Sequence, residues 1–412
     1  MTGPLAILAD DLTGAADAGA PFAAIGRRTV VLLSPDSQAL TAADVLVLTS
    51  ESRGMPPWEA MEATRRSATR VRAWCRRDAA VRVYKKIDST LRGHPGLELR
   101  VLMDTLGARA ALVAPAFPAQ GRTTVSGRQF VNGVPIEQTS FGREVTTSDL
   151  RALFAGDADE AVVLLSRDDL QLGADHLARR FRREREVGLW IADAEDESDL
   201  AEVAAAVLAS PLRVMCGSAG LARAIAAASG QRPTPPSAIG SEAPVLVVAG
   251  SRHAATVAQV HALARRGEVV VRPEVALLEQ GDPSAAARTV ARVVDVMVTG
   301  RSVVLSTADL PDVAADRVDV AARLASIVAG VAHRIRLGGL VLTGGDTAWA
   351  VCDALGSDSV LLTGELQPAI ATGTLMGGQP PNLPVVTKAG GFGDEAVLGQ
   401  ARAFLARGSR EL

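Results

Sequence analysis

Short runs of aliphatic and β-branched residues recur along this chain, separated by longer segments rich in Ala, Arg and Glu. Such alternation predicts parallel strands joined by crossover helices. The runs predicted as strands in the first half are residues 5–9, 29–33, 45–49, 81–85, 111–114 and 161–166. Those in the second half are residues 245–249, 268–272, 302–306, 339–343 and 385–388, with helical stretches at 254–266 and 284–299.

A proline-rich stretch separates the two sets of strands. Residues 230–244, GQRPTPPSAIGSEAP, hold four prolines, which forbid a regular helix and interrupt strand pairing. A chain of 412 residues also exceeds what one hydrophobic core usually organises. We therefore predict an α/β fold of two α/β domains, each with a largely parallel or mixed sheet flanked by helices, and a ligand cleft between them. The predicted boundaries are 1–232 for the N-terminal domain, 233–243 for a linker and 244–412 for the C-terminal domain.

Charge and cysteine content narrow the classes of partner. A formal net charge of −3 gives no field that would collect nucleic acid or an anionic membrane, so neither is an expected partner. Cys75, Cys216 and Cys352 lie far apart without the spacing of a zinc site or a disulfide framework. The first residues lack a basic region and soon meet Asp10 and Asp11, so we expect no signal peptide and a cytoplasmic protein. A homo-oligomer is left open.

Two adjacent acids, Asp10 and Asp11, directly follow the first predicted strand and precede an Ala-rich helix. Open α/β sheets bind ligands at the carboxyl ends of their strands. Carboxylates at that position accept hydrogen bonds from substrate hydroxyls or hold a cation. The alternative is that Asp11 or Thr13 merely caps the helix.

A second polar segment, KKIDSTLRGH at residues 85–94, also follows a predicted strand. Lys86 and Arg92 are suited to pair with a substrate carboxylate, and Ser89 and Thr90 to bind its hydroxyls. An acidic polyol would match this combination. The alternative makes Ser89 a helix cap and the basic residues a solvated face.

Three glycine-rich segments lie in the predicted C-terminal domain, at residues 343–347 (TGGDT), 372–378 and 388–393. Glycines let phosphate groups approach backbone amides, so three such turns together predict a phosphate-binding wall. Neither a Walker A loop nor a GxGxxG fingerprint is present. Ser251, in AGSRH, opens the first helix of this domain and offers a hydroxyl to a nucleotide. Ordinary tight turns and a Ser-capped helix are the alternatives.

These motifs together resemble the four-carbon acid sugar kinase family. The resemblance rests on ADDLTGAADAG, YKKIDSTLRGH, APAFPAQGR, VNGVP, CGSAGLA, AGS, TGGDT and KAGGFG, and it covers almost the whole chain. It implies an N-terminal substrate-binding domain and a C-terminal nucleotide-binding domain. The implied reaction is ATP-dependent phosphorylation of threonate, erythronate, 3-oxo-tetronate or a similar acid at the terminal hydroxyl, with Mg²⁺ bridging phosphate oxygens.

The resemblance also implies roles for individual residues. Those implied to face the acid substrate are Asp10, Asp11, Lys86, Asp88 and Arg92. Those implied to contact ATP are Ser251, Gly344, Gly345, Asp346, Thr347 and Gly391. Asp11 is our leading hypothesis for the acid that orients the attacking hydroxyl, and Asp346 is the next; no metal ligand is predicted.

Two other functions remain open at this point. A decarboxylase, isomerase or dehydrogenase acting on a similar acid lacks a nicotinamide fingerprint or a metal-ligand cluster in this sequence. A non-catalytic sugar-acid sensor would suit two α/β lobes equally well. The glycine-rich second half favours the kinase over the sensor.

Overall fold

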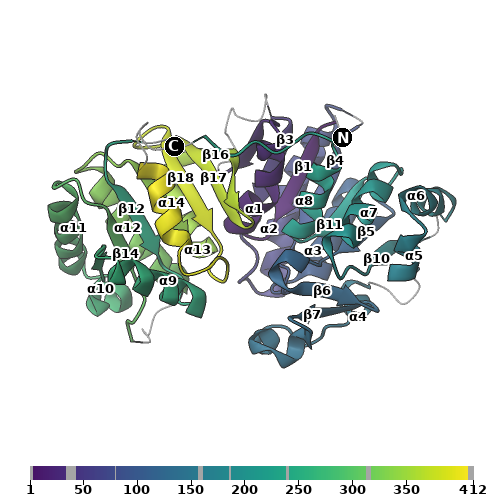
Figure 1. Ribbon diagram of the computed structural model, residues 1–412, viewed down its shortest axis with the longest axis horizontal. Helices are drawn as coiled ribbons and strands as arrows, with labels where there is room; N and C mark the ends of the chain where they lie inside the picture. The colour runs from purple at the N-terminus through teal and green to yellow at the C-terminus, as the bar shows by residue number, and fades with distance from the viewer. Residues whose placement is uncertain are drawn as a thin grey trace. The chain divides into compact units, whose positions relative to one another are not determined.

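The computed structural model describes residues 3–33, 43–78, 80–155, 161–184, 187–237, 241–311 and 317–406. The chain divides into two compact units (Figure 1). Unit 1 comprises Met1–Thr29 and Ala43–Pro233, and unit 2 comprises Val30–Ala42 and Thr234–Leu412. Within the ranges that the structure describes, no helix is long and apolar enough to cross a membrane.

Unit 1 is built on a parallel sheet of seven strands in the order β3-β1-β4-β11-β5-β10-β9. Strands β1 and β5 are buried along their whole length, which explains why they read as unbroken apolar runs in the sequence. The strands are β1 (Leu5–Ala9), β3 (Val45–Thr49), β4 (Arg82–Lys86), β5 (Ala111–Ala114), β9 (Val162–Leu165), β10 (Leu189–Ala192) and β11 (Val214–Gly217).

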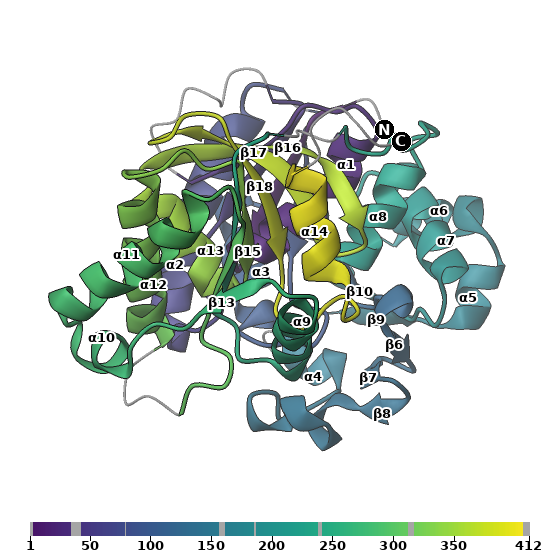
Figure 2. The same ribbon diagram turned by 60° about the vertical axis from the view of Figure 1, so that its left-hand side comes forward.

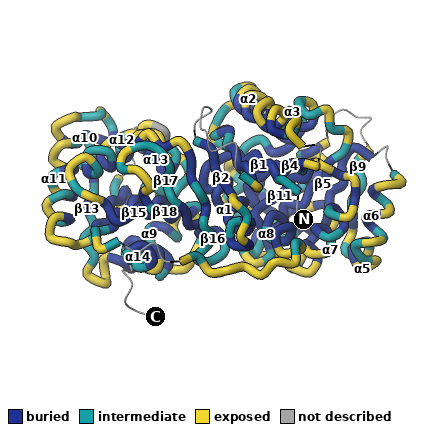
Figure 3. The backbone as a smooth tube through the Cα atoms, turned by 90° about the horizontal axis from the view of Figure 1, so that it is seen from above, coloured by how far each residue is buried: buried dark blue, intermediate teal, exposed yellow. Residues whose placement is uncertain are grey.

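Helices cover both faces of this sheet (Figure 3). Helices α2 and α3 pack together on one face, while α1, α8, α7 and α6 pack in series on the other. The helices of unit 1 are α1 (Leu12–Ala24), α2 (Pro57–Cys75), α3 (Pro95–Leu106), α4 (Leu150–Phe154), α5 (Arg167–Gln171), α6 (Ala174–Arg183), α7 (Glu197–Leu208) and α8 (Ala219–Ala227).

A small antiparallel sheet belongs to the same unit. Its strands are β6 (Arg122–Val125), β7 (Arg128–Val131) and β8 (Val134–Pro135), and the 3-10 helices around it are η2 (Pro118–Gln120), η3 (Ile136–Gln138) and η4 (Ser140–Arg143). Gln129 of β7 donates a hydrogen bond of 2.9 Å to the Ser89 carbonyl oxygen. The small sheet therefore supports the polar segment that follows β4.

Unit 2 has a mixed sheet in the order β13-β14-β12-β15-β18-β17-β16, with β2 (Thr29–Leu32) next to β16. The first five strands are parallel, whereas β16 and β17 form an antiparallel hairpin whose second strand pairs antiparallel with β18. The strands are β12 (Val245–Ala249), β13 (Val269–Val271), β14 (Val303–Ser306), β15 (Gly339–Thr343), β16 (Ser357–Gln367), β17 (Ile370–Gly377) and β18 (Leu383–Lys388).

Two groups of helices flank the sheet of unit 2 (Figure 2). Helices α10, α11, α12 and α13 pack with one another, and α9 packs with α14. Their bounds are α9 (Ala254–Arg265), α10 (Val275–Gln280), α11 (Pro283–Met297), α12 (Arg317–Ala332), α13 (Gly345–Ala354) and α14 (Val397–Ala406).

The predicted fold class, with a largely parallel or mixed sheet flanked by helices in each half, is confirmed. One local expectation is wrong: residues 372–378 form no turn beside the other glycine-rich segments, because most of them lie in β17. Since Ile370 pairs with Lys388, β17 runs away from the carboxyl ends of the parallel strands. Of the predicted linker, residues 238–240 lie outside the described ranges.

Candidate active site

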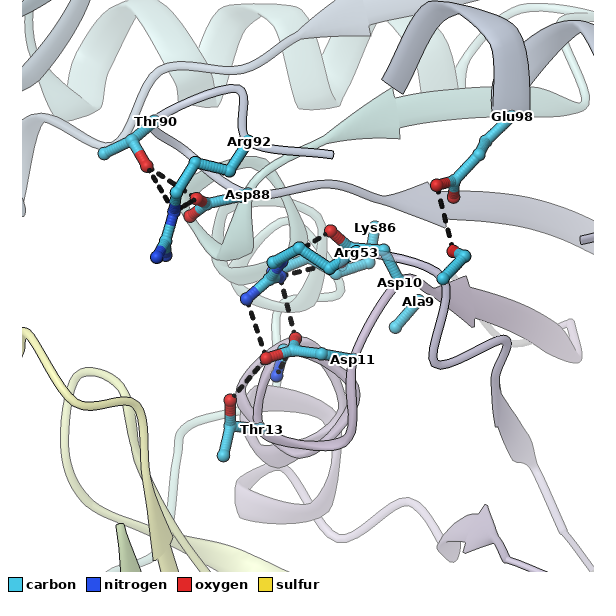
Figure 4. A network of polar contacts seen from close by, with 12 residues as sticks. Ala9, Asp10, Asp11, Thr13, Arg53, Lys86, Asp88, Thr90, Arg92 and Glu98 are labelled. Atoms are coloured by element: carbon cyan, nitrogen blue, oxygen red, sulfur yellow. Dashed lines mark hydrogen bonds and ion pairs between the residues drawn. The ribbon is translucent and has the colours of Figure 1, made fainter. Parts of the chain in front are cut away.

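The polar segments of unit 1 meet because their strands are neighbours. Strands β3, β1 and β4 are adjacent and parallel, so the residues that follow them share one edge of the sheet. Figure 4 shows the side chains that gather there. They come from the ends of β1 and β4, and from a loop after β3 that sequence reasoning did not single out.

Arg53, in that loop, binds both acids that follow β1. Its guanidinium donates hydrogen bonds of 2.8 Å from Nε to Asp10 Oδ2 and 2.8 Å from Nη2 to Asp10 Oδ1. It also donates to Asp11, from Nη1 to Oδ2 at 2.7 Å and from Nη2 to Oδ1 at 2.8 Å. Paired hydrogen bonds of this kind fix the planar groups in one geometry. The two carboxylates are therefore held as a single rigid unit (Figure 4).

Asp11 has a second, structural role. It is the N-cap of α1, where its Oδ1 accepts a 2.8 Å hydrogen bond from the Gly14 amide, and its Oδ2 accepts from the Thr13 hydroxyl at 2.7 Å. The helix-cap alternative for Asp11 is thus correct, but it does not exclude a role toward a ligand. An ionised carboxylate has about four lone-pair sites, and Asp11 already accepts four hydrogen bonds.

Lys86 brings an ammonium group to the same edge. Its side chain is buried, and among the described residues its Nζ makes no hydrogen bond. A Cβ at Gly14 would lie 2.8 Å from Lys86 Nζ and 2.4 Å from Asp11 Oδ1. Gly14 is therefore the residue that leaves room for the Lys86 ammonium beside the start of α1.

Asp88 and Arg92 form the third part of the site. Arg92 Nε and the Thr90 hydroxyl each donate a 2.5 Å hydrogen bond to Asp88 Oδ2. The Arg92 guanidinium also lies 5.8 Å from the centre of the Phe141 ring, within range of a cation–π contact. Arg92 keeps about a third of its side chain exposed, so part of its guanidinium can still meet a ligand.

The cations determine the charge state of the acids. Burial opposes ionisation of Asp88, but Arg92 and then Arg53 hold the pKa of this carboxyl well below its usual value. Burial also opposes ionisation of Asp10, and the charge of Arg53 lowers its pKa. For Arg53 itself, burial is outweighed by Asp10 and Asp11, which raise the pKa of the guanidinium. Asp10, Asp88 and Arg53 therefore carry fixed charges at neutral pH.

A buried ion pair lies next to these charged residues, between β4 and α3. Lys85 Nζ lies 2.7 Å from Glu98 Oε2, and both side chains are inaccessible to solvent. Burial lowers the pKa of Lys85, but Glu98 and then Asp10 more than reverse this and raise it. Ser52 donates a 2.9 Å hydrogen bond to the other oxygen of Glu98. This pair ties β4 and α3 to the loop that carries Arg53.

The proposed cap at Ser89 is wrong. Helix α3 begins at Pro95 with His94 as its N-cap residue, so Ser89 lies in a loop before it. Leu91 in that loop has φ +58° and Glu51 has φ +49°, a backbone region costly for residues other than glycine. Strained backbone of this kind occurs where a loop must present its side chains in one arrangement.

The glycine-rich segments of unit 2 also meet at one sheet edge. Strands β12, β15 and β18 are adjacent and parallel, so Ser251, the start of α13 and the segment after Lys388 lie together. The Gly344 amide donates a 3.0 Å hydrogen bond to the Lys388 carbonyl oxygen. Thr256 of α9 donates a 2.8 Å hydrogen bond to the Gly390 carbonyl oxygen. Three loops are thereby joined into one surface.

Glycine is required where these loops touch. A Cβ at Gly390 would lie 2.1 Å from Ser251 Oγ, and a Cβ at Gly250 would lie 2.1 Å from Thr347 Oγ1. Gly344 has φ +99°, which disfavours any other residue. The site is thus packed so closely that only backbone fills these positions, and backbone amides are what phosphate groups bind.

The remaining ATP-site predictions are placed as follows. Gly345 and Asp346 occupy the first turn of α13, where helix amides have no partner within the helix, and Asp346 is exposed. A Cβ at Gly391 would lie 3.2 Å from Nε2 of His253. The Ser-cap alternative is wrong, because His253 is the N-cap residue of α9.

Two models of protein families match this chain. Residues 5–225 match the model of a sugar-binding N-terminal domain, and residues 246–398 match that of a nucleotide-binding C-terminal domain. A crystal structure of a Haemophilus influenzae protein has the same fold, with a TM-score of 0.74 at 21% identity over 97% of this chain and all of the other.

Curated relatives of similar length carry kinase names. A D-threonate kinase of Salmonella typhimurium is 34% identical over 97% of both chains, and one of Cupriavidus necator is 37% identical over 96% of both. Relatives at 31% and 32% identity are a D-erythronate kinase and a 3-oxo-tetronate kinase. These kinase relatives, together with a sugar-binding domain followed by a nucleotide-binding domain, define the class as a carbohydrate kinase. The chain belongs to the four-carbon acid sugar kinase family, which confirms the resemblance found in its sequence.

Proposed function

We propose that this protein transfers the γ-phosphoryl group of ATP to the terminal hydroxyl of a four-carbon sugar acid, with D-threonate as the first candidate. The observation that carries the proposal is that one chain holds two different kinds of site, one charged and one lined by glycines. Cations and carboxylates gather at the carboxyl ends of the parallel strands of unit 1. In unit 2, glycine-lined loops gather at the carboxyl ends of its own parallel strands. An acid with several hydroxyls needs the first kind of site, and a polyphosphate needs the second.

In unit 1, Lys86 and the exposed part of Arg92 would pair with the substrate carboxylate. Lys86 is suited to this because its side chain is largely buried while its ammonium has no hydrogen-bonding partner among the described residues. Asp10 accepts two hydrogen bonds from Arg53 and so keeps lone pairs for a substrate hydroxyl. Asp88 would hold Arg92 in place.

In unit 2, the amides at the start of α13 and after Lys388 would cradle the phosphates, with Ser251, Gly344, Gly345, Thr347 and Gly391 as contacts. A Mg²⁺ ion would neutralise charge on the phosphate oxygens. The described residues contain no cluster of three or more His, Cys, Asp or Glu side chains, so we propose that the nucleotide itself supplies most ligands of this ion.

Asp11 and Asp346 remain the proposed acids for orienting the attacking hydroxyl. Phosphoryl transfer depends mainly on alignment and charge stabilisation. Asp11 already accepts four hydrogen bonds, so it would act on the hydroxyl only after Arg53 or Thr13 moves, and otherwise by fixing Arg53. A comparison of Asp10→Asn, Asp11→Asn and Asp346→Asn in single-turnover assays would separate these roles.

The test of the proposal is a substrate panel. The protein is incubated with Mg-ATP and threonate, erythronate, 3-oxo-tetronate or 4-hydroxythreonate, while ADP formation and product mass are followed. We expect one acid to gain the mass of a phosphoryl group. ADP formation that is independent of every acid would count against the proposed substrate class, and failure to bind ATP would exclude the kinase reaction.

A further inference from the structure

Lys388, the last residue of β18, is a buried cation beneath a glycine-rich loop. Its side chain is 1% exposed. Its Nζ donates hydrogen bonds of 3.0, 3.1 and 3.1 Å to the carbonyl oxygens of Ala389, Gly390 and Phe392. The Thr256 hydroxyl lies 3.3 Å away as a fourth partner. The Lys388 ammonium therefore hydrogen-bonds mainly to the backbone of its own loop.

This arrangement determines where the loop amides point. In a trans peptide, the C=O of one residue and the N–H of the next point in opposite directions. Because three carbonyl oxygens face the ammonium, the N–H groups of Gly390, Gly391 and Gly393 face away from it. Within the described ranges these three amides donate no hydrogen bond. Outward amides without partners form the kind of concave surface that binds phosphate oxygens.

The buried charge of Lys388 also lacks a counter-ion. No Asp or Glu of the described residues hydrogen-bonds or pairs with it, and burial lowers the pKa of Lys388 to about 7. The elements packed around the loop present Thr343 from β15 and Thr256, Gln259 and His253 from α9. Of these, His253 alone has a titratable side chain, and it is already the N-cap of α9.

We propose that Lys388 is a positioning residue for the nucleotide: its ammonium turns the three glycine amides toward the phosphates, and the phosphates provide the negative charge that its surroundings lack. The inference rests on the proposed function. Since an unpaired buried ammonium is costly, the free protein holds Lys388 partly neutral near pH 7. A bound polyphosphate favours the charged form, so nucleotide binding takes up a proton.

Isothermal titration calorimetry with the full chain tests this directly. A non-hydrolysable ATP analogue with Mg²⁺ is titrated at pH 8, where a phosphate group with a pKa near 6 is fully ionised. The titration is repeated in two buffers of different ionisation enthalpy, so that the difference in measured heat gives the number of protons taken up. We expect uptake of between about half a proton and one proton per nucleotide, and almost none at pH 6, where Lys388 is already charged.

Two variants separate charge from packing. Lys388→Met is expected to abolish the uptake, to weaken nucleotide binding about tenfold or more, and to raise KM for ATP without changing KM for the acid. Lys388→Arg stays charged at every pH tested, so it should bind without proton uptake and with little dependence on pH. Circular dichroism checks that both variants fold.

The outcomes distinguish the two proposals. Nucleotide binding with no proton uptake at pH 8 in the natural protein would overturn the role of Lys388 and leave the kinase proposal standing, and this result needs no variant. Normal binding by Lys388→Met would do the same. Absence of any nucleotide binding by the natural protein would refute the proposed function, and the role of Lys388 with it.

Discussion

Arg53 donates two hydrogen bonds to Asp11, at 2.7 and 2.8 Å, although 42 residues separate them in the chain. The same guanidinium holds Asp10, so one arginine fixes both acids at the end of β1. A site built in this way is pre-organised before any ligand arrives, which limits the reorganisation that a reaction has to overcome.

Arg53 is therefore expected to be essential for use of the acid substrate. Arg53→Lys keeps the positive charge but cannot reach both carboxylates in a planar fork. We expect kcat/KM for the acid to fall about 10- to 100-fold, while the Kd of ATP, which we propose to bind in unit 2, stays unchanged. Steady-state kinetics and calorimetry measure the two quantities. An unchanged kcat/KM would show that the fork is dispensable.

Gly14→Ala is predicted to damage the same site by steric means. The added methyl would meet Asp11 Oδ1 at 2.4 Å and Lys86 Nζ at 2.8 Å. We expect KM for the acid to rise at least about tenfold, because the loss of a hydrogen bond to a charged group costs about 1.5–3 kcal/mol. Gly54→Ala is the matched control, since no atom lies within 4 Å of its added Cβ. Equal KM values for the two variants would contradict the placement of Lys86.

Gly390→Ala is the equivalent change in unit 2. Its methyl would lie 2.1 Å from Ser251 Oγ, so the loop after β18 must move. We expect nucleotide binding to weaken about tenfold or more while acid binding is retained. Gly399→Ala in α14, where the nearest atom is the flexible end of Arg266 at 3.2 Å, serves as the control. Loss of acid binding instead of nucleotide binding would refute the assignment of the two sites.

The buried pair of Lys85 and Glu98 is predicted to carry stability. Removal of one partner leaves an uncompensated charge in the core, which typically costs about 3–5 kcal/mol. Glu98→Gln should therefore lower the free energy of unfolding, measured in urea, by about 3 kcal/mol. The double variant Lys85→Met with Glu98→Leu should recover much of this loss. If the stability losses of the two single variants, Lys85→Met and Glu98→Leu, simply added up in the double variant, the two groups would not interact.

Asp88 should make stability depend on pH in the acid range. The pKa of Asp88 is lower in the folded protein than in the unfolded chain, where it is about 4. Its contribution is therefore complete at neutral pH, and it is lost as the pH falls through the folded-state pKa. We expect the difference in unfolding free energy between the natural protein and Asp88→Asn to shrink from pH 6 to pH 3. A constant difference would exclude this linkage.

Much of this architecture could be predicted from the sequence because buried parallel strands read as continuous apolar runs. The hairpin of β16 and β17 was missed, since Pro368 and Ala369 join its strands without the usual Asn-Gly or Asp-Gly signal, and Ala369 takes φ +72°. Glycines at 373 and 377 then made β17 resemble a turn.

The candidate site could likewise be predicted only in part from local sequence patterns. Asp10 and Asp11 follow β1, Lys86 ends β4 and Asp88 lies two residues beyond it, so topology alone brings them to one edge. Arg53 lies in a loop with no such signal, and its role depends on a contact across 42 residues that no local pattern encodes. Strand β3 ends four residues earlier, and its adjacency to β1 is the one clue that would have identified this arginine.

The position of the phosphate group on the product tests the proposed reaction. The protein is incubated with Mg-ATP and D-threonate, and the phosphorylated acid is examined by ³¹P NMR with coupling to protons. We expect one phosphomonoester whose phosphorus couples to the two protons of the terminal carbon, formed in equal amount with ADP. A phosphate on an internal hydroxyl, or inorganic phosphate with unmodified acid, would contradict the proposed reaction.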